Sequence, residues 1–222
     1  IFSHTFEKPV DAYFETISGL TTTGASVMQA KKFDPITGIE VPYIEKAGDN
    51  QKEYIFYGTI MPVLSPETGD EIYTGIEAVS PGILFWRSFT QWIGGMGIVV
   101  LFVAILPALG VGGRLLFQAE VPGPIKDSMT PRIKETASIF WKIYIGLTLL
   151  QMITLYFAEE KVTWLDAVTI SMSTLSTGGF SIHNSGISYY QSSFVEWVII
   201  AFMILGGINF THYVYCLRGK IY

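Results

Sequence analysis

The chain contains one segment twice, at a constant spacing of 155 residues. Residues 11–26 align without a gap onto residues 166–181, and seven of the sixteen aligned positions are identical. Chance would give roughly one identity at average residue usage. Each copy begins as an amphipathic helical pattern and ends in a short Thr/Ser/Gly-rich stretch, and long apolar runs lie beside both. Many transport proteins are built by internal duplication, so the pattern predicts a duplicated re-entrant loop in a membrane protein that conducts ions.

The composition agrees with a membrane protein. Half of the 222 residues are hydrophobic and only 15% are charged, and the mean hydropathy is +0.40, whereas soluble domains are more polar. The net charge of −5 argues against nucleic acid as a partner. A single cysteine, Cys216, excludes an intrachain disulfide and a cysteine-based metal site. Because the chain begins with Ile and no span precedes the first loop, we expect an internal fragment of a longer protein.

Three apolar runs are long enough, or nearly so, to cross a bilayer, which takes about 20 helical residues. Residues 88–113 and 197–217 contain no charged residue, and a third helix is expected over 136–158, where Lys142 can extend its ammonium group to the interface. Basic residues in the connection at 111–135 and in the tail predict that both lie in the cytoplasm. The expected fold class is therefore an all-α membrane protein with both repeated loops on the outer side.

A polar stretch at residues 29–82 separates the first loop from the span that follows it. Between residues 29 and 80 it has nine acidic and four basic residues, with short Tyr/Ile/Val runs. We expect an extracytoplasmic insertion with some β structure, folded over the outer mouth. Two roles stay open for it: a solvated, variable loop, or an acidic surface that raises the local cation concentration.

Both repeated segments have the signals of a short helix that stops abruptly. Pro9 suits the first turn of the first helix, and Thr163 and Asp166 have the spacing of a capping box in the second. The helices should end after Leu20 and Leu175, with the negative ends of their dipoles toward a cation. The stretches that follow suit an alternating, partly left-handed backbone, which glycine adopts at little cost. Unpaired carbonyls are tolerated at membrane depth only beside water or ions, so the sequence predicts a carbonyl-lined ion filter.

Four groups of longer motifs run along the chain. They are Phe-Glu at 14–15 with Thr-Thr-Thr-Gly at 21–24, Phe-Trp-Arg-Ser-Phe-Thr-Gln-Trp-Ile-Gly-Gly-Met-Gly-Ile at 85–98 with Leu-Pro-Ala-Leu-Gly at 106–110, Pro-Gly-Pro at 122–124 with Pro-Arg at 131–132, and Ser-Thr-Gly-Gly-Phe-Ser at 176–181. In these motifs the chain resembles the membrane subunit of bacterial Trk-type potassium uptake systems, in the Trk/Ktr/HKT superfamily of cation transporters. The resemblance covers nearly everything outside the insertion.

The resemblance implies four helix–pore-loop–helix repeats around a central ion pore, of which this chain has two. Gly24 and Gly179 would be the filter glycines of the first two repeats. The carbonyl donors beside them would be Thr22, Thr23, Thr177 and Gly178. The transported ion would be K⁺, with no organic cofactor and no enzymatic activity. Because two loops cannot close a fourfold ring, the other two repeats are expected elsewhere in the same protein.

The predicted domains follow the repeats. The pore helix and filter of repeat 1 occupy 1–28, the insertion 29–82, the inner helix of repeat 1 83–110 and the cytoplasmic loop 111–135. Repeat 2 occupies 136–222, with an outer helix at 136–158, a pore helix at 163–175, a filter at 176–179 and an inner helix at 193–217.

The resemblance also implies surroundings and partners. The protein would be a multi-pass protein of the bacterial plasma (inner) membrane that contacts lipid and its own two remaining repeats and forms a homodimer. The connection at 114–135 would touch a cytosolic nucleotide-binding regulatory subunit. The alternative is that this connection is a structural loop at the lipid headgroups.

Three other functions stay open. They are a sodium or mixed monovalent cation transporter of the same superfamily, a non-transporting sensor on the same scaffold, and an intramembrane enzyme. In the plant branch of the superfamily a serine at the first filter glycine goes with sodium transport, so Gly24 favours potassium. An enzyme would need a motif such as His-Glu-x-x-His or Gly-x-Ser-x-Gly, and neither occurs. His4, His183 and His212 are too scattered for a metal site or a catalytic dyad, and core packing or interfacial hydrogen bonding suits them better.

Two further features bear on the architecture. Glu15 and Arg87 are charges at membrane depth, where an unpaired charge is expensive, so they either pair behind the filter or face interfacial water. The glycines at 94–97 and 206–207 occupy corresponding places in the two inner helices once 43 insertion residues, 155 minus 112, are discounted. Small residues let helices approach closely, so we expect packing against the pore loops, with a flexible gate as the alternative. Asn209 either lines the pore or bonds a neighbouring helix.

Overall fold

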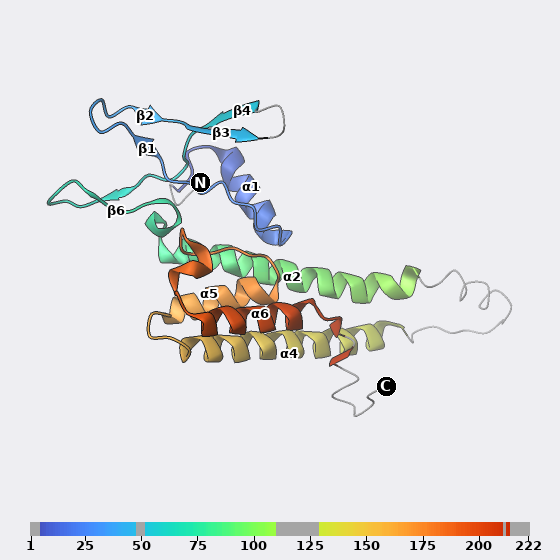
Figure 1. Ribbon diagram of the computed structural model, residues 1–222. Helices are drawn as coiled ribbons and strands as arrows, with labels where there is room; N and C mark the ends of the chain where they lie inside the picture. Colours follow the sequence, from blue (N-terminus) through green and yellow to red (C-terminus); the bar gives the residue numbers. More distant parts are fainter. Residues whose placement is uncertain (1–4, 48–51, 110–128, 211, 214–222) are drawn as a thin grey trace, which may run out of the picture.

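The structure, a computed structural model, describes residues 5–47, 52–109, 129–210 and 212–213. It consists of a helical part and, at one end of it, a group of β-hairpins (Figure 1). The helices are α1 (Pro9–Leu20), α2 (Pro81–Leu109), α4 (Met129–Tyr156), α5 (Trp164–Leu175) and α6 (Ser193–Gly207), with the 3₁₀ turns η1 (Gly75–Ala78) and η2 (Gly186–Tyr189). The strands are β1 (Lys32–Phe33), β2 (Glu40–Val41), β3 (Tyr43–Ala47), β4 (Lys52–Phe56), β5 (Val63–Leu64) and β6 (Glu71–Tyr73).

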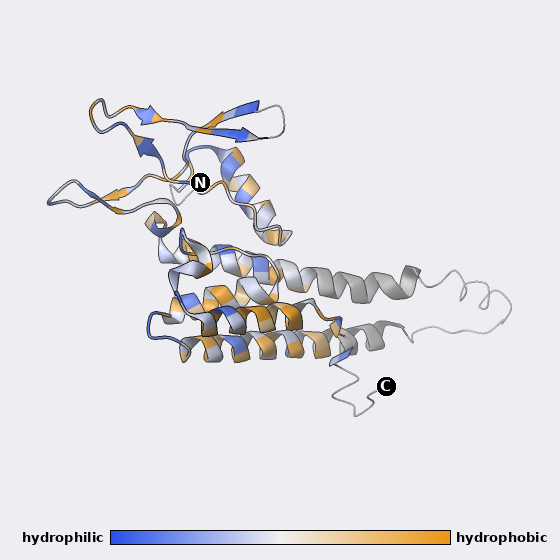
Figure 2. Ribbon diagram, viewed as in Figure 1, coloured by the Kyte–Doolittle hydropathy of each residue, from blue (hydrophilic) through white to orange (hydrophobic). Residues whose placement is uncertain are grey.

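The short helix α5 is central to the helical part. It contacts α2, α4 and α6, which lie roughly parallel to it, while α1 packs at an angle against α2 (Figure 1). Apolar side chains, mainly from α4, α5, α6 and their connections, form the main core, and these helices carry many residues coloured as hydrophobic in Figure 2. Its buried members are Met96, Phe140, Tyr144, Leu155, Val162, Ala167, Ile170, Leu175, Tyr190, Val195, Val198, Ile199, Phe202 and Phe210.

The predicted β structure of the insertion is present as three antiparallel hairpins, β1–β2, β3–β4 and β5–β6. A second, smaller core joins the base of these hairpins to the helices. It is built from Met28, Ile60, Val79, Leu84 and Ile182. Because Met28 follows the first repeated loop and Ile182 follows the second, this core anchors the insertion at the exits of both loops.

Among the described residues, one helix is long and apolar enough to cross a membrane. By length and composition, the segment Ala137–Tyr156 of α4 is able to cross a membrane, and α6 is a shorter apolar helix of 15 residues. Helix α2 runs unbroken for 29 residues, which includes most of the predicted span at 88–113. Residues 110–113 of that span lie outside the described residues, as does most of the predicted cytoplasmic loop.

Two helix boundaries differ from the sequence prediction by more than two residues. Helix α4 begins at Met129, ahead of the expected residue 136, because Pro131 falls in its first turn, where a proline is tolerated. Helix α6 ends at Gly207, so the prediction of one helix over 193–217 is wrong at Ile208, whose ψ of 140° leaves the helix. The two glycines at 206 and 207 make that exit inexpensive. The hydroxyl of Tyr213 donates to the carbonyl of Leu205 at 2.6 Å, which satisfies a group that the helix end leaves free.

Glycines allow the inner helices to contact the ends of α1 and α5. A Cβ atom added at Gly94 would lie well under 3.0 Å from the carbonyl oxygen of Leu20, and one at Gly206 would lie 3.0 Å from that of Leu175. A Cβ atom added at Gly95 would lie 2.8 Å from the Cβ atom of Ser176. The predicted close packing of these glycines against the repeated loops is therefore confirmed at both related places.

The substitution Gly94→Ala should destabilise the protein, because its methyl group would overlap the end of α1. We expect a loss of about 1–3 kcal/mol in the free energy of unfolding, measured as a lower thermal unfolding temperature in detergent. Gly97→Ala is the matched control on the same helix, since nothing lies within 4 Å of a Cβ at Gly97. Equal unfolding temperatures for the two variants would contradict the packing argument.

Candidate functional site

The two repeated loops, residues 21–24 and 176–179, have the same unusual backbone. The φ angles of Thr22 and Thr177 are 54° and 53°, and those of Gly24 and Gly179 are 75° and 80°. The predicted alternation of left-handed residues is thus confirmed, and it includes a threonine in each loop besides the glycine that adopts this conformation at little cost. A threonine held at positive φ costs of order 1–3 kcal/mol and persists only when its surroundings impose it.

Hydrogen bonds from the helix ends impose this conformation. Thr22 N–H donates to Gly19 O and Thr23 N–H to Ser18 O, both at 3.0 Å. In the second loop, Thr177 N–H donates to Thr174 O and Gly178 N–H to Ser173 O, both at 2.9 Å. This pair of bonds is the Schellman motif, which normally places glycine at the left-handed position. Each loop is therefore an extension of a helix C-terminal cap.

The caps also determine where two of the loop carbonyls point, those of Thr22 and Thr177. In a trans peptide the C=O and N–H groups point in opposite directions, so amides directed back into the helices turn the preceding carbonyls away from them. Within the described part of the chain, no group donates a hydrogen bond to the carbonyl oxygens of the six predicted site residues. These residues are Thr22, Thr23, Gly24, Thr177, Gly178 and Gly179.

The structure brings the two loops together. A Cβ added at Gly24 would lie well under 3.0 Å from the carbonyl oxygen of Gly178. A Cβ at Gly179, in contrast, would have nothing within 4 Å, so this residue faces open space. Gly24 and Gly178 are thus in contact, and Gly179 lies at the open side of the pair.

A buried ion pair lies behind the loops. Arg87 on α2 donates to Glu15 Oε2 on α1 through Nε and Nη2, each at 3.3 Å, and both residues are only 5% exposed. The predicted pairing of these residues is confirmed, and the alternative, that each faces interfacial water, is wrong. The Glu15 carboxylate also accepts hydrogen bonds from Val27 N–H at 2.8 Å and from the Ser26 hydroxyl.

The Arg87 guanidinium connects the two repeats. It donates from Nη2 to the Ser26 hydroxyl at 3.0 Å and from Nη1 to the Ser181 carbonyl at 3.3 Å. Ser26 and Ser181 are equivalent positions of the duplication, immediately after each loop. The guanidinium also lies 4.0 Å over the ring of Phe180. One side chain therefore holds the exits of both loops against each other.

A second polar cluster, which the sequence analysis did not predict, surrounds His183. Its Nδ1 lies 3.1 Å from Glu77 Oε1 in η1, and its Nε2 lies 3.2 Å from Asp166 Oδ1 at the start of α5. The ring stacks on Tyr189 with centroids 3.6 Å apart. Asp166 also completes the predicted capping box with Thr163. The cluster fastens the insertion to the start of α5.

Two carboxylates on opposite ring nitrogens favour the imidazolium form, because only that form donates from both nitrogens. Burial lowers the pKa of His183, but the hydrogen bonds to Asp166 and Glu77 outweigh burial, so its pKa lies above the ordinary value. The carboxylates lie on opposite sides of the ring, and the described residues contain no group of His, Cys, Asp and Glu suited to a metal ion.

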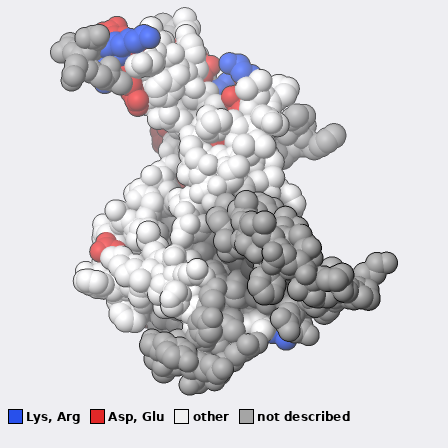
Figure 3. Space-filling view, turned by 90° about the vertical axis from the view of Figure 1, so that its right-hand side faces the viewer, with Lys and Arg blue, Asp and Glu red and all other residues white. Residues whose placement is uncertain are grey.

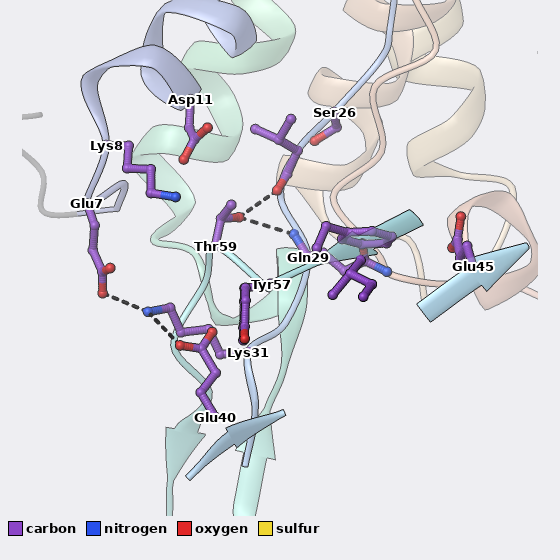
Figure 4. A pocket seen from close by; sticks show the side chains of 14 residues that line it. Glu7, Lys8, Asp11, Ser26, Gln29, Lys31, Glu40, Glu45, Tyr57 and Thr59 are labelled. Carbon is purple, nitrogen blue, oxygen red and sulfur yellow. Dashed lines mark hydrogen bonds and ion pairs between the residues drawn. The ribbon is translucent and has the colours of Figure 1, made fainter. Parts of the chain in front are cut away.

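A polar cavity of about 830 Å³ lies between the start of α1 and the insertion, beside the exit of the first loop (Figure 4). Four carboxylates and two lysines are among its lining residues: Glu7, Asp11, Glu40, Glu45, Lys8 and Lys31. Lys31 Nζ lies 2.8 Å from Glu7 and 3.8 Å from Glu40. In the view of Figure 3 most of the coloured charged side chains lie at this end of the molecule. The excess of acid is of the kind that would attract cations, as one of the two predicted roles requires.

The variant Glu15→Gln should destabilise the protein by about 3 kcal/mol, because it leaves the Arg87 charge buried without its partner. The double variant Glu15→Gln/Arg87→Met should lose much less, because it removes both charges. Thermal unfolding in detergent measures both effects. If the double variant loses as much stability as Glu15→Gln and Arg87→Met lose when added together, the two side chains do not act as a pair.

His183 should make stability depend on pH. Since its folded pKa is raised, its contribution is fully present below the unfolded value of about 6.5 and is lost as pH rises through the folded pKa. Wild-type protein should therefore lose thermal stability relative to His183→Gln as pH rises from about 6 into the alkaline range. The control His212→Gln, at an exposed histidine, should keep the wild-type pH dependence. Parallel pH curves for wild type and His183→Gln would exclude the charged cluster.

Comparisons with known proteins place the chain in a family. A family model described as TrkH, cation transport protein, matches residues 64–220. The chain is 39% identical over 209 residues to the Trk system potassium uptake protein TrkH of Halomonas elongata, covering 93% of this chain and 34% of that protein. It is 36% identical over 211 residues to TrkH of Escherichia coli, covering 95% of this chain and 34% of that protein. The chain thus spans about a third of the length of these curated relatives.

A solved structure is also similar. The crystal structure of the potassium transporter TrkH from Vibrio parahaemolyticus matches with a TM-score of 0.62 and 33% identity, over 94% of this chain and 32% of that one. This likeness confirms the predicted helical membrane protein, and the relatives are transporters rather than enzymes. The chain belongs to the TrkH family of cation transport proteins.

Proposed function

We propose that this chain forms the first two of four pore-loop repeats of a Trk-type potassium transporter. In this proposal the carbonyls of residues 22–24 and 177–179 are two sides of the selectivity filter. The observation that carries it is the repeated backbone: left-handed residues at the same alternate positions of both loops, with free carbonyl oxygens and direct contact between Gly24 and Gly178. No other part of the described chain combines these three properties.

The chemistry of such a site is the replacement of water. A dehydrated K⁺ needs a ring of oxygen atoms, and successive carbonyls supply one when their amides are bonded elsewhere. Here the Schellman bonds engage those amides, and the C-terminal ends of α1 and α5 add partial negative charge near the loops. The strain at Thr22 and Thr177 would then serve to hold carbonyls where the ion binds.

Two loops do not close a ring of carbonyls around an ion. The described helices carry exposed apolar faces that the two remaining repeats would help to cover. On α1, Val10 and Tyr13 are 72% and 69% exposed, and on α6, Trp197 is 69% exposed. Large apolar surfaces of this kind are covered in a working membrane protein. We assign them to the two remaining repeats, to lipid and to a second copy of the protein in a homodimer.

The proposed organisation keeps the predicted domains, with α1 and α5 as pore helices, α2 and α6 as inner helices and α4 as an outer helix. The hairpins would lie on the outer side of a bacterial plasma membrane that the protein crosses several times. The connection at 111–135 would lie in the cytoplasm, where a nucleotide-binding regulatory subunit would bind. A positive balance in a short connection favours that side of the membrane.

Potassium is the ion we assign, because the similar curated proteins are named as potassium uptake proteins and Gly24 occupies the first filter position. The second candidate, a sodium or mixed cation transporter, uses the same loops. A non-transporting sensor on this scaffold differs in passing no ion. A liposome assay with ⁸⁶Rb⁺ and with radioactive Na⁺ on the complete transporter separates the sensor from both transporters, since only a sensor passes neither ion.

Substituting serine at Gly24 or Gly179 should lower the selectivity for K⁺ over Na⁺ by roughly tenfold or more, since each change forces a side chain into a left-handed residue. Gly24→Ser should be the more severe, because its side chain also meets the Gly178 carbonyl, whereas Gly179 faces open space. Gly146→Ser on α4 is the control, with nothing within 4 Å of its Cβ position. Wild-type selectivity in both filter variants would refute the assignment of the loops.

A further inference from the structure

Gln91 is a polar residue of α2 that the sequence analysis left without a role. Its side chain is completely buried, at 0% exposure. The amide oxygen Oε1 accepts a hydrogen bond from the Ser173 hydroxyl at 2.7 Å and another from Phe180 N–H at 3.2 Å. Ser173 precedes the second loop and Phe180 follows it, so one oxygen atom connects the two ends of that loop.

The same amide lies flat against the middle of the loop. A Cβ added at Gly178 would lie 2.6 Å from both Oε1 and Nε2 of Gln91. The φ angle of Gly178 is not in the left-handed region, and the equivalent residue of the first loop is Thr23. The glycine at 178 is therefore required by the Gln91 amide rather than by its backbone conformation.

The contact continues into the first loop. The Gly178 carbonyl meets the side of Gly24 where a Cβ would be, and Gln91 Nε2 lies 3.8 Å from that position. Gln91, Gly178 and Gly24 thus form a line from the inner helix to the contact between the two loops. A shift of the amide would move the Gly178 carbonyl against Gly24.

The buried amide is also costly, which argues against a mere filling role. Gln91 Nε2 has no hydrogen-bond partner among the described residues, and a buried donor without a partner costs stability. Methionine would fill a similar volume without that cost. What methionine lacks is the acceptor that holds Ser173 and Phe180.

We infer that Gln91 is a positioning residue of the second filter loop, whose amide oxygen sets the distance between the loop ends and whose face sets the place of the Gly178 carbonyl. This inference rests on the proposed function of the loops. It assigns to α2 a part in ion selectivity, besides its part in packing.

The test measures ⁸⁶Rb⁺ uptake by the complete transporter in liposomes, with Na⁺ as competitor. Gln91→Met, which removes the acceptor, should raise KM for Rb⁺ and weaken K⁺ over Na⁺ selectivity about tenfold each, the effect of losing one buried acceptor. Gln91→Glu should stay within about threefold of wild type, because a fully buried carboxyl stays neutral and keeps an accepting oxygen. Gln151→Met is the control, since Gln151 on α4 is equally buried and its amide has no partner in the described structure.

A second pair of variants tests the other side of the hydrogen bond and avoids any change of volume at Gln91. Ser173→Ala removes the donor to Oε1 and should raise KM in the same direction, about threefold. Ser171→Ala removes another fully buried hydroxyl of the same helix, one with no partner in the described structure, and should leave KM unchanged.

A purely structural role would lower the amount of active protein, and so Vmax, while KM and selectivity stay at wild-type values. That result for Gln91→Met or Ser173→Ala overturns the inference, as does a Gln91→Glu variant as impaired as Gln91→Met. If Gln91→Met fails to fold, the serine pair decides. Absence of Rb⁺ flux in the wild-type protein would instead refute the proposed function, and the inference would fall with it.

Discussion

The site depends on a helix cap that ends on threonine. In both repeats the amides of the second and third loop residues turn back onto the last helical turn, at 2.9 to 3.0 Å. This engages the donors of the loop and leaves its acceptors free. It also places Thr22 and Thr177 at positive φ, where a threonine stays only under constraint. Everything packed behind the loops can therefore be understood as the source of that constraint.

Charge burial supplies one part of the constraint. The Arg87–Glu15 pair is removed from water, and such a pair contributes little net stability compared with apolar residues of the same volume. Its value here lies in geometry, since Arg87 reaches both Ser26 and Ser181 while Glu15 holds the backbone of Val27. The pair fixes the exits of two loops that are far apart in sequence. The His183 cluster likewise connects the insertion to α5, and its bond to Glu77 joins residues more than 100 positions apart in the sequence.

The predictable features are those whose signals are local. Pro9, Leu20 and the Thr163–Asp166 box mark helix ends in any context, and the structure has them as expected. The Glu15–Arg87 pair was foreseeable because a charge at membrane depth demands a partner. The His183 cluster was not, because its partner Glu77 is brought close only by the fold of the insertion. Likewise, the left-handed threonines were not predicted, because the helix caps and the contacts packed behind them together outweigh the propensity of a single residue.

Helix α2 explains why two loops from different repeats adopt one conformation. Arg87, Gln91 and the glycines at 94 and 95 are spaced at i, i+4, i+7 and i+8, so they lie along one face of the helix. Arg87 meets the residues after the loops, Gln91 meets the middle of the second loop, and the glycines meet the two helix ends where the loops begin. Eight residues of helix extend about 12 Å, a length comparable to that of a short extended loop. One face of α2 thus follows both loops from entrance to exit, and the two are held in the same conformation because a single rigid element supports them both.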